Sequence, residues 1–142
     1  MAGDELAEGG ERFPVVREFD ATRVAQRTKL IAQSAGLDDT ASHRLATAAS
    51  ELAHNILKYA GSGSLTVRII RRRGQRGVEL IAEDEGPGIE DIAAALRDHF
   101  STAGTLGLGL PGVQRLTDEL TIDSEIGRGT RVTARSWSRD RG

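Results

Sequence analysis

The sequence predicts an α+β fold, a two-layer α/β sandwich in which a mixed, mostly antiparallel sheet carries its helices on one face. Two segments, 65–83 and 119–137, alternate between apolar and polar residues around a glycine-containing turn, which is typical of β-hairpins. The long segments with helical period come before the first hairpin, and shorter ones lie between the hairpins. Because the strands are paired locally and the helices are grouped apart from them, an antiparallel sheet covered by a helical layer is expected.

The size and charge of the chain limit its organisation and its partners. Its 142 residues suffice for one compact domain: we expect a disordered leader over 1–12, a folded domain over 13–137 and a polar tail over 138–142. A formal net charge of -2 gives no reason to expect nucleic acid or an anionic membrane as a partner. The absence of cysteine excludes a disulfide scaffold and a thiolate metal site. No apolar run approaches the length of a membrane span, so a cytoplasmic location is the default expectation.

The domain is expected to begin with a strand and a helix. Residues 13–19 (FPVVREF) have the β-branched and aromatic content of a strand, and Pro14 suggests that it starts at a sheet edge. Asp20 or Thr22 is the expected N-cap of the following helix, which ends at Gly36.

A longer helix is expected from the capping residues 38–40 to about Ala60. Its apolar side chains recur at helical period and must face a core: Leu45, Ala48, Leu52 and Ile56. A polar ridge is expected beside them: Thr47, Glu51, Asn55 and Lys58. Glu51 and Asn55 stack one turn apart on the same face, although an isolated pair of this kind is usually an ordinary solvated helix surface.

The turn of the first hairpin, 71–77 (RRRGQRG), is the most basic patch of the chain. It could contact phosphates or an acidic partner. With no aromatic residue nearby to stack on bases, a charged tip that keeps a sheet edge soluble is the favoured interpretation. After this hairpin we expect a short helix at 89–97, a loop at 98–109 and a helix at 110–116 with Pro111 in its first turn.

Three features gain meaning from their combination: the helix with Glu51 and Asn55, the glycine turn at 84–88, and the glycine loop before the helix at 110–116. Each alone is common, since glycines often only permit a turn or loosen a loop. A glycine loop that feeds a helix N-terminus also presents unpaired backbone N–H groups and the positive end of the helix dipole. That arrangement suits phosphate groups.

Four motifs in this order resemble the N, G1, G2 and G3 boxes of the GHKL ATPase/kinase superfamily, which has the Bergerat ATP-binding fold. They are ELAHN at 51–55, DEGPG at 84–88, GTLGLGLPG at 104–112 and GRGT at 127–130. The match covers about residues 40–137. The small size, the DEGPGI sequence and the GLGLPG-x-x-RL run resemble the RsbT-type switch serine kinases of the stressosome and, more broadly, the anti-sigma-factor kinases.

The resemblance implies an adenine site. Asp84 would accept a hydrogen bond from the exocyclic amine of adenine, which selects ATP over GTP because guanine presents a carbonyl there. Gly86 and Gly88 would let the backbone approach the base without an intervening Cβ. Thr130 would support the adenine through its hydroxyl.

The resemblance also implies a site for the phosphates and Mg²⁺. Asn55 would bind Mg²⁺ through its side-chain oxygen, and Glu51 would orient or deprotonate the attacking nucleophile. The lid over the phosphates would include five residues, the leucines through their amides: Gly104, Gly107, Leu108, Gly109 and Leu110. Two positions depart from the family pattern. His54 replaces a basic residue and is interpreted as a satisfied, partly buried histidine, and Thr105 stands where glycine is more typical.

The activity implied by the resemblance is that of a serine/threonine protein kinase. The chain has no room for the extra domains of other superfamily members, so its phosphoacceptor is expected on another protein, by resemblance a STAS-domain antagonist in a partner switch. A sigma factor or a PP2C-type phosphatase would be the output partner, without nucleic acid or membrane. One alternative is an anti-sigma factor that mainly sequesters a sigma factor. Another is an ATP-binding adaptor that activates a phosphatase by contact, but that role would not need Glu51.

Overall fold

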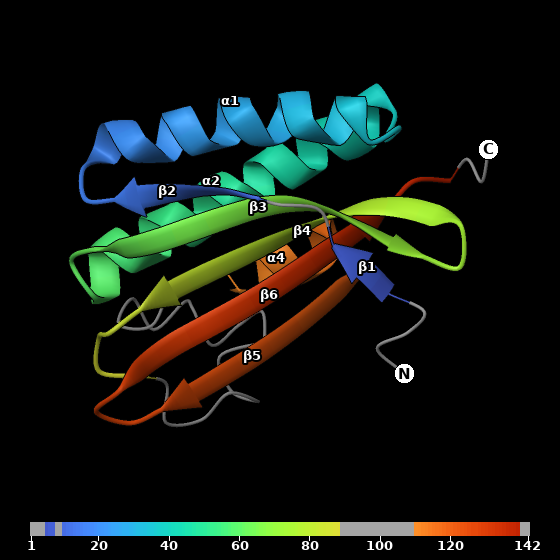
Figure 1. Cartoon of the computed structure of the whole chain (residues 1–142). Helices are drawn as coiled ribbons and strands as arrows, with labels where there is room; N and C mark the ends of the chain where they lie inside the picture. The colour runs from blue at the N-terminus through green and yellow to red at the C-terminus, as the bar shows by residue number, and fades with distance from the viewer. Residues whose placement is uncertain (1–4, 8–9, 89–109, 140–142) are drawn as a thin grey trace.

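The computed structural model describes residues 5–7, 10–88 and 110–139 (Figure 1). The elements follow in the order β1 (Glu5–Ala7), β2 (Glu11–Val15), α1 (Glu18–Ser34), α2 (Asp39–Tyr59), β3 (Gly63–Arg72), β4 (Gln75–Asp84), α4 (Leu110–Leu116), β5 (Glu119–Glu125) and β6 (Gly129–Trp137). Within these residues, no helix is long and apolar enough to cross a membrane.

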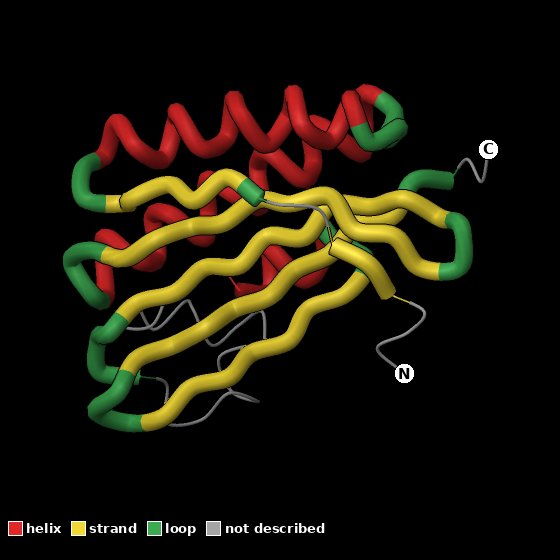
Figure 2. The backbone as a smooth tube through the Cα atoms, viewed as in Figure 1, coloured by secondary structure: helices red, strands yellow, loops and turns green. Residues whose placement is uncertain are grey.

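The strands form one six-stranded sheet in the order β1-β3-β4-β6-β5, and β2 also pairs with β3. Every strand pairing among the described residues is antiparallel. The helices lie together on one face of this sheet (Figures 1 and 2). The expected two-layer α+β architecture is therefore confirmed.

The N-terminal segment differs from the prediction. Residues 5–7 and 11–12, assigned to a disordered leader, belong to strands that pair with β3. The expected strand at 13–19 is wrong in its second half, because β2 ends at Val15 and Phe19 lies in α1. The edge position of Pro14 is confirmed, since β2 pairs only with β3 within the described chain. Pairing with a distant strand, rather than the local pattern, decides these boundaries.

The carboxylate of Asp20 explains the early start of α1. It accepts the backbone N–H groups of Val16 at 2.9 Å and Arg17 at 3.0 Å, so residue 17 is the N-cap and Asp20 is not. These hydrogen bonds, the one from Val16 first, hold the pKa of Asp20 below its usual value. Asp20 thereby satisfies N–H groups that the helix itself leaves unpaired.

Helix α2 carries the predicted apolar stripe. It begins at the N-cap Asp38, whose carboxylate accepts the Ala41 N–H at 2.7 Å. The stripe is buried to within 2% exposure: Leu45, Ala48, Leu52 and Ile56. It packs on the inward residues of β3, β4 and β6 in a single core cluster. Burial of each large apolar side chain contributes about 1.5–3 kcal/mol, which fixes the rotation of α2 and so the direction of its polar ridge.

The basic hairpin has a tighter turn than the expected 71–77. Strand β3 runs to Arg72 and β4 starts at Gln75, which leaves Arg73 and Gly74 as the turn, with φ of 52° and 80°. Two positive φ values are the signature of a type I′ turn. The guanidinium of Arg72 lies 4.5 Å from the ring centroid of Trp137 and pairs with a carboxylate of β5 at 2.8 Å. These contacts of Arg72 with β5 and β6 support the interpretation of 71–77 as a charged hairpin tip, with its base packed on the neighbouring strands.

A row of alternating charges crosses the sheet on the face away from the helices. Glu79 of β4 is 1% exposed and pairs with Arg68 of β3 at 2.5 Å and with Arg135 of β6 at 2.7 Å. Arg135 also lies 3.7 Å from Glu119 of β5. Glu79 is directly opposite both arginines in the two ladders. The row therefore joins four neighbouring strands at one level.

Candidate functional site

Most of the expected site residues that the structure describes come from three elements whose ends meet at one end of the sheet (Figure 1). These are the second half of α2, the end of β4 and the start of β6. Asp84 and Thr130 are direct partners in the β4–β6 ladder. The structure thus brings the two expected adenine contacts side by side.

Hydrogen bonds orient both of these side chains. Asp84 Oδ1 accepts the Gly86 N–H at 2.8 Å, which holds the carboxylate against the turn that follows. Ser124 Oγ donates to the carbonyl of Gly129 at 3.1 Å and lies 2.9 Å from Thr130 Oγ1. Because the Ser124 proton goes to the carbonyl, the Thr130 hydroxyl donates to Ser124. Thr130 and Asp84 therefore both retain acceptor lone pairs, which suit an amino group.

Ser124 was missed by sequence reasoning. It stands directly opposite Thr130 in the β5–β6 ladder. The signal that could have found it is the register of the predicted second hairpin, which places a hydroxyl beside Thr130 once the turn is fixed.

Close backbone packing requires glycine at several positions of this end. A Cβ on Gly86 would lie 2.7 Å from Cβ of Ala60 at the end of α2. Gly88 has a φ of +84°, and its Cβ would lie 2.6 Å from the carbonyl oxygen of Glu125. Gly129 belongs to the GRGT motif but was given no role of its own from the sequence; its φ is +116° and its Cβ would lie 2.0 Å from the carbonyl oxygen of Asp84. These glycines hold the 84–88 turn, α2 and the β5–β6 hairpin together, and a contact of Gly86 or Gly88 with a base remains a prediction.

The polar ridge of α2 lies beside the buried stripe as expected. Glu51 is exposed and Asn55 is half-buried, one turn further along the helix. Within the part of the chain that the structure describes, neither side chain has a hydrogen-bond or ion-pair partner. This carboxylate and carboxamide, which no other described residue engages, are available to a ligand.

His54 contacts α1 rather than the ridge. Its Nε2 lies 3.2 Å from Glu18 Oε2, and its Nδ1 lies 3.4 Å from Ser50 Oγ. The side chain is 47% exposed, so the expected partial burial is wrong, although the ring has polar partners. It connects the start of α1 to the helix that carries Asn55.

The expected lid falls largely outside the described residues. This applies to the helix at 89–97 and to the lid positions Gly104, Thr105, Gly107, Leu108 and Gly109. Leu110 is the first residue of α4, and its side chain is buried in the core. Its amide as a phosphate donor remains a prediction.

The residues present fit Mg²⁺ only as an ion shared with a ligand. Among the described residues, no group of three His, Asp or Glu side chains could hold a metal ion alone. Asn55 offers a neutral oxygen that has no competing partner among residues 5–7, 10–88 and 110–139. A single hard ligand is sufficient for Mg²⁺, which takes its other ligands from water and phosphates.

Comparison with known proteins identifies the family of the chain. Residues 40–139 match the family described as Histidine kinase-, DNA gyrase B-, and HSP90-like ATPase. The chain is 43% identical over 125 residues to the Serine/threonine-protein kinase RsbT of Bacillus subtilis (strain 168), covering 88% of this chain and 94% of that protein. It is 34% identical over 114 residues to the Anti-sigma F factor of Caldanaerobacter subterraneus subsp. tengcongensis, with 75% and 78% coverage. The Anti-sigma F factor of Thermoanaerobacter sp. (strain X514) is 33% identical over the same length.

These matches confirm the superfamily and the class of enzyme that the four motifs implied. The family match spans all four motifs, from the α2 ridge to the start of β6. The chain belongs to the histidine kinase-, DNA gyrase B- and HSP90-like ATPase family, within which it is similar to serine/threonine-protein kinases and anti-sigma factors.

Proposed function

We propose that the protein transfers the γ-phosphate of ATP to a serine or threonine of a STAS-domain antagonist in a partner-switching stress response. The observation that carries this proposal is Glu51, an exposed carboxylate without a described partner, one turn before Asn55. Nucleotide binding alone would not need it, whereas phosphoryl transfer needs a group that orients or deprotonates the acceptor hydroxyl. The similarity to a serine/threonine-protein kinase supports the same conclusion.

The adenine is recognised by Asp84 and Thr130. The Asp84 carboxylate accepts a hydrogen from the exocyclic amine, and Thr130 offers a second acceptor because its proton is committed to Ser124. Guanine would present a carbonyl oxygen to these acceptors and leave them unpaired, which costs about 1–3 kcal/mol for each buried group. Gly86 and Gly88 border the base.

The ridge of α2 would face the phosphates, and Asn55 would be the protein ligand of Mg²⁺. When bound, the ion neutralises phosphate charge during transfer. By the family resemblance, five residues of the lid would donate backbone N–H groups to the phosphates: Gly104, Gly107, Leu108, Gly109 and Leu110. The acceptor hydroxyl gives its proton to Glu51 while its oxygen forms the new bond to the γ-phosphorus, and ADP leaves.

Substitution of Glu51 tests the proposal. In the Glu51→Ala variant we expect phosphotransfer from ATP to a cognate STAS protein to fall at least about 100-fold. The dissociation constant of ATP, measured by calorimetry, should change less than about threefold. Glu18→Gln is the matched control, because it removes another exposed carboxylate beside α2. Full transfer by Glu51→Ala would remove Glu51 from the reaction, and Asp84→Asn should lose nucleotide binding itself.

A second candidate function is favoured by the similarity to anti-sigma F factors. In that case the nucleotide-bound protein mainly sequesters a sigma factor, or activates a PP2C-type phosphatase by contact. Stable co-purification with a sigma factor, together with unaltered sequestration by Glu51→Ala, would favour this function over the kinase. Either function places the protein, as one folded domain that includes β1 and β2, in the cytoplasm, where ATP and Mg²⁺ are available.

A further inference from the structure

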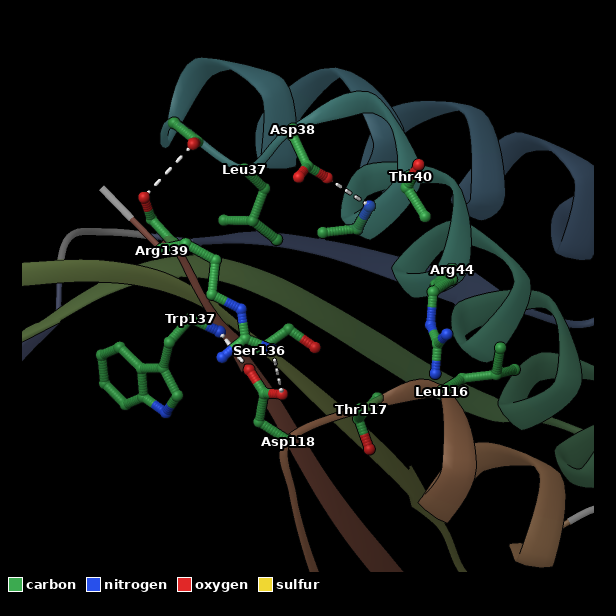
Figure 3. Close-up of a pocket in the computed structure, with 13 residues that line it drawn as sticks. Leu37, Asp38, Thr40, Arg44, Leu116, Thr117, Asp118, Ser136, Trp137 and Arg139 are labelled. Atoms are coloured by element: carbon green, nitrogen blue, oxygen red, sulfur yellow. Dashed lines mark hydrogen bonds and ion pairs between the residues drawn. The ribbon is translucent and has the colours of Figure 1, made fainter. Parts of the chain in front are cut away.

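A cavity of about 470 Å³ lies at the far end of α2 from the nucleotide site. Its walls come from four segments that are distant in sequence: 36–38, the first turns of α2, 116–118 and 136–139 (Figure 3). The 21 residues of α2 span about 30 Å, with this cavity at the start and Asn55 near the end. Strand β6 likewise has Thr130 at its start and the cavity at its end. The cavity is therefore separate from the proposed ATP site.

Arg44 supplies a positive charge to this cavity that a ligand could pair with. Its side chain reaches from α2 toward the end of α4 (Figure 3). There Nη2 donates to the backbone carbonyl of Arg115. A guanidinium has five N–H donors, and a neutral carbonyl leaves its charge uncompensated. Within the part of the chain that the structure describes, Arg44 has no carboxylate partner.

The two carboxylates of the lining already have partners. Asp38 caps α2 through the Ala41 N–H at 2.7 Å. Asp118 accepts the Trp137 N–H at 2.8 Å and lies 3.6 Å from a guanidinium nitrogen of Arg139. The two arginines and two aspartates of the lining balance in formal charge, and Arg44 is the arginine that no carboxylate of the described residues pairs with. A single carboxylate can pair with Arg44, whereas Asp38 and Asp118 would repel a multiply charged anion such as phosphate.

The walls also include apolar side chains, which suits a peptide more than a small ion. Leu37, Ala41 and Leu116 line the cavity together with the polar groups. A volume in the range of ordinary ligand pockets accommodates a few side chains. A glutamate or aspartate flanked by apolar residues would pair with Arg44 and bury its neighbours against these walls.

We propose that this cavity is a docking site for an acidic segment of a partner protein, in which one Asp or Glu side chain pairs with Arg44. The cavity lies at the start of α2, where Arg44 precedes Glu51 by about 10 Å and Asn55 by about 17 Å along the helix. A partner held there leaves the proposed catalytic ridge open to the phosphoacceptor. The inference does not depend on the kinase proposal, because it concerns binding at the other end of the domain.

Peptide titration followed by ¹H–¹⁵N NMR of the full chain tests the site. The probes are acetyl-Leu-Glu-Leu-amide and its uncharged match, acetyl-Leu-Gln-Leu-amide. We expect the glutamate peptide to shift the amide signals of Arg44, Thr117 and Ser136, and the glutamine peptide to bind about tenfold more weakly. Arg44→Gln should remove this difference. Arg128→Gln, which makes the same change of charge at the distant β5–β6 turn, should retain it.

Several outcomes would overturn the proposal. They are no shift at about 10 mM peptide, equal binding of the two peptides, shifts confined to the nucleotide end, or tighter binding of inorganic phosphate at the same amides. Thr40→Trp gives a second variant in case Arg44→Gln does not fold. Thr40 is exposed and lines the cavity, so the indole should block the peptide and leave ADP affinity unchanged.

Discussion

Replacement of Gly129 by alanine tests whether the close approach of the β4 and β6 backbones at this position aligns Asp84 with Thr130. A Cβ at Gly129 would lie 2.0 Å from the carbonyl oxygen of Asp84 and 2.8 Å from Cα of Glu85. Real Cβ atoms essentially never approach closer than 3.0 Å, so the β4 and β6 backbones must separate by about 1 Å. Both neighbours are backbone atoms, which cannot rotate away.

The expected magnitude follows from this separation. A ladder hydrogen bond lengthened by about 1 Å no longer forms, which costs about 0.5–1.5 kcal/mol. The φ of +116° adds backbone strain of about 1–3 kcal/mol for a residue with a Cβ. We expect Gly129→Ala to lower the free energy of unfolding by about 2–4 kcal/mol. Displacement of Asp84 should weaken ADP binding at least about tenfold.

Gly127→Ala is the matched control. Gly127 also has a positive φ, +82°, but a Cβ there would meet nothing within 4 Å. It should cost only backbone strain and leave ADP affinity intact. The single tryptophan, Trp137, is buried at the end of β6 and reports urea unfolding by fluorescence, while calorimetry gives the ADP affinity. The reasoning is refuted if Gly129→Ala matches Gly127→Ala in both quantities.

Three further predictions concern single side chains. Ser124→Ala frees the Thr130 proton to donate, so the preference for ADP over GDP in competition binding should shrink about tenfold; an unchanged preference would contradict the proton assignment. The folded-state pKa of Asp20 lies below its unfolded value, so its stabilisation is complete above the unfolded pKa and is lost as pH falls through the folded one. Urea unfolding of Asp20→Asn should therefore depend less on pH than that of the parent between about pH 5 and 3, and parallel curves would rule out this role. Leu52→Ala should lower the free energy of unfolding by about 2–5 kcal/mol, because Leu52 is buried in the core. The control Thr47→Ala, on the exposed face of α2, should lower it by less than about 0.5 kcal/mol. Equal losses would show that burial of the α2 stripe does not stabilise the fold.

The predictable part of the fold is the part encoded by local periodicity. The α2 stripe, including Leu45 and Leu52, and both hairpins follow from spacing alone, because one face of each element must be buried. The N-terminal strands could not be predicted in this way. Glu11 and Arg12 are exposed, and their strand exists because β3 offers partners. Phe19 was assigned to a strand because aromatic residues are common in strands, but it lies on the exposed side of α1 with 66% exposure. Its residue type therefore predicted the wrong element.

The candidate site can likewise be divided into features that the local sequence predicts and features that only tertiary pairing decides. The motifs identified Asp84 and Thr130, but only the ladder shows that the two residues are opposite each other. Ser124 and Gly129 act through a hydrogen-bond chain and a backbone contact, which depend on that register. Local sequence carries the identity of the functional groups, whereas tertiary pairing carries their alignment.

The charge row on the outer sheet face has a consequence for nucleotide selectivity. Glu79 and Arg135 face each other in the same β4–β6 ladder in which Asp84 faces Thr130. A shift of one strand by a single position would turn Glu79 into the apolar interior, and a shift by two would separate it from its arginine. The ion pairs thus help to fix the register of the two strands, and with it the alignment of Asp84 and Thr130, the proposed purine contacts.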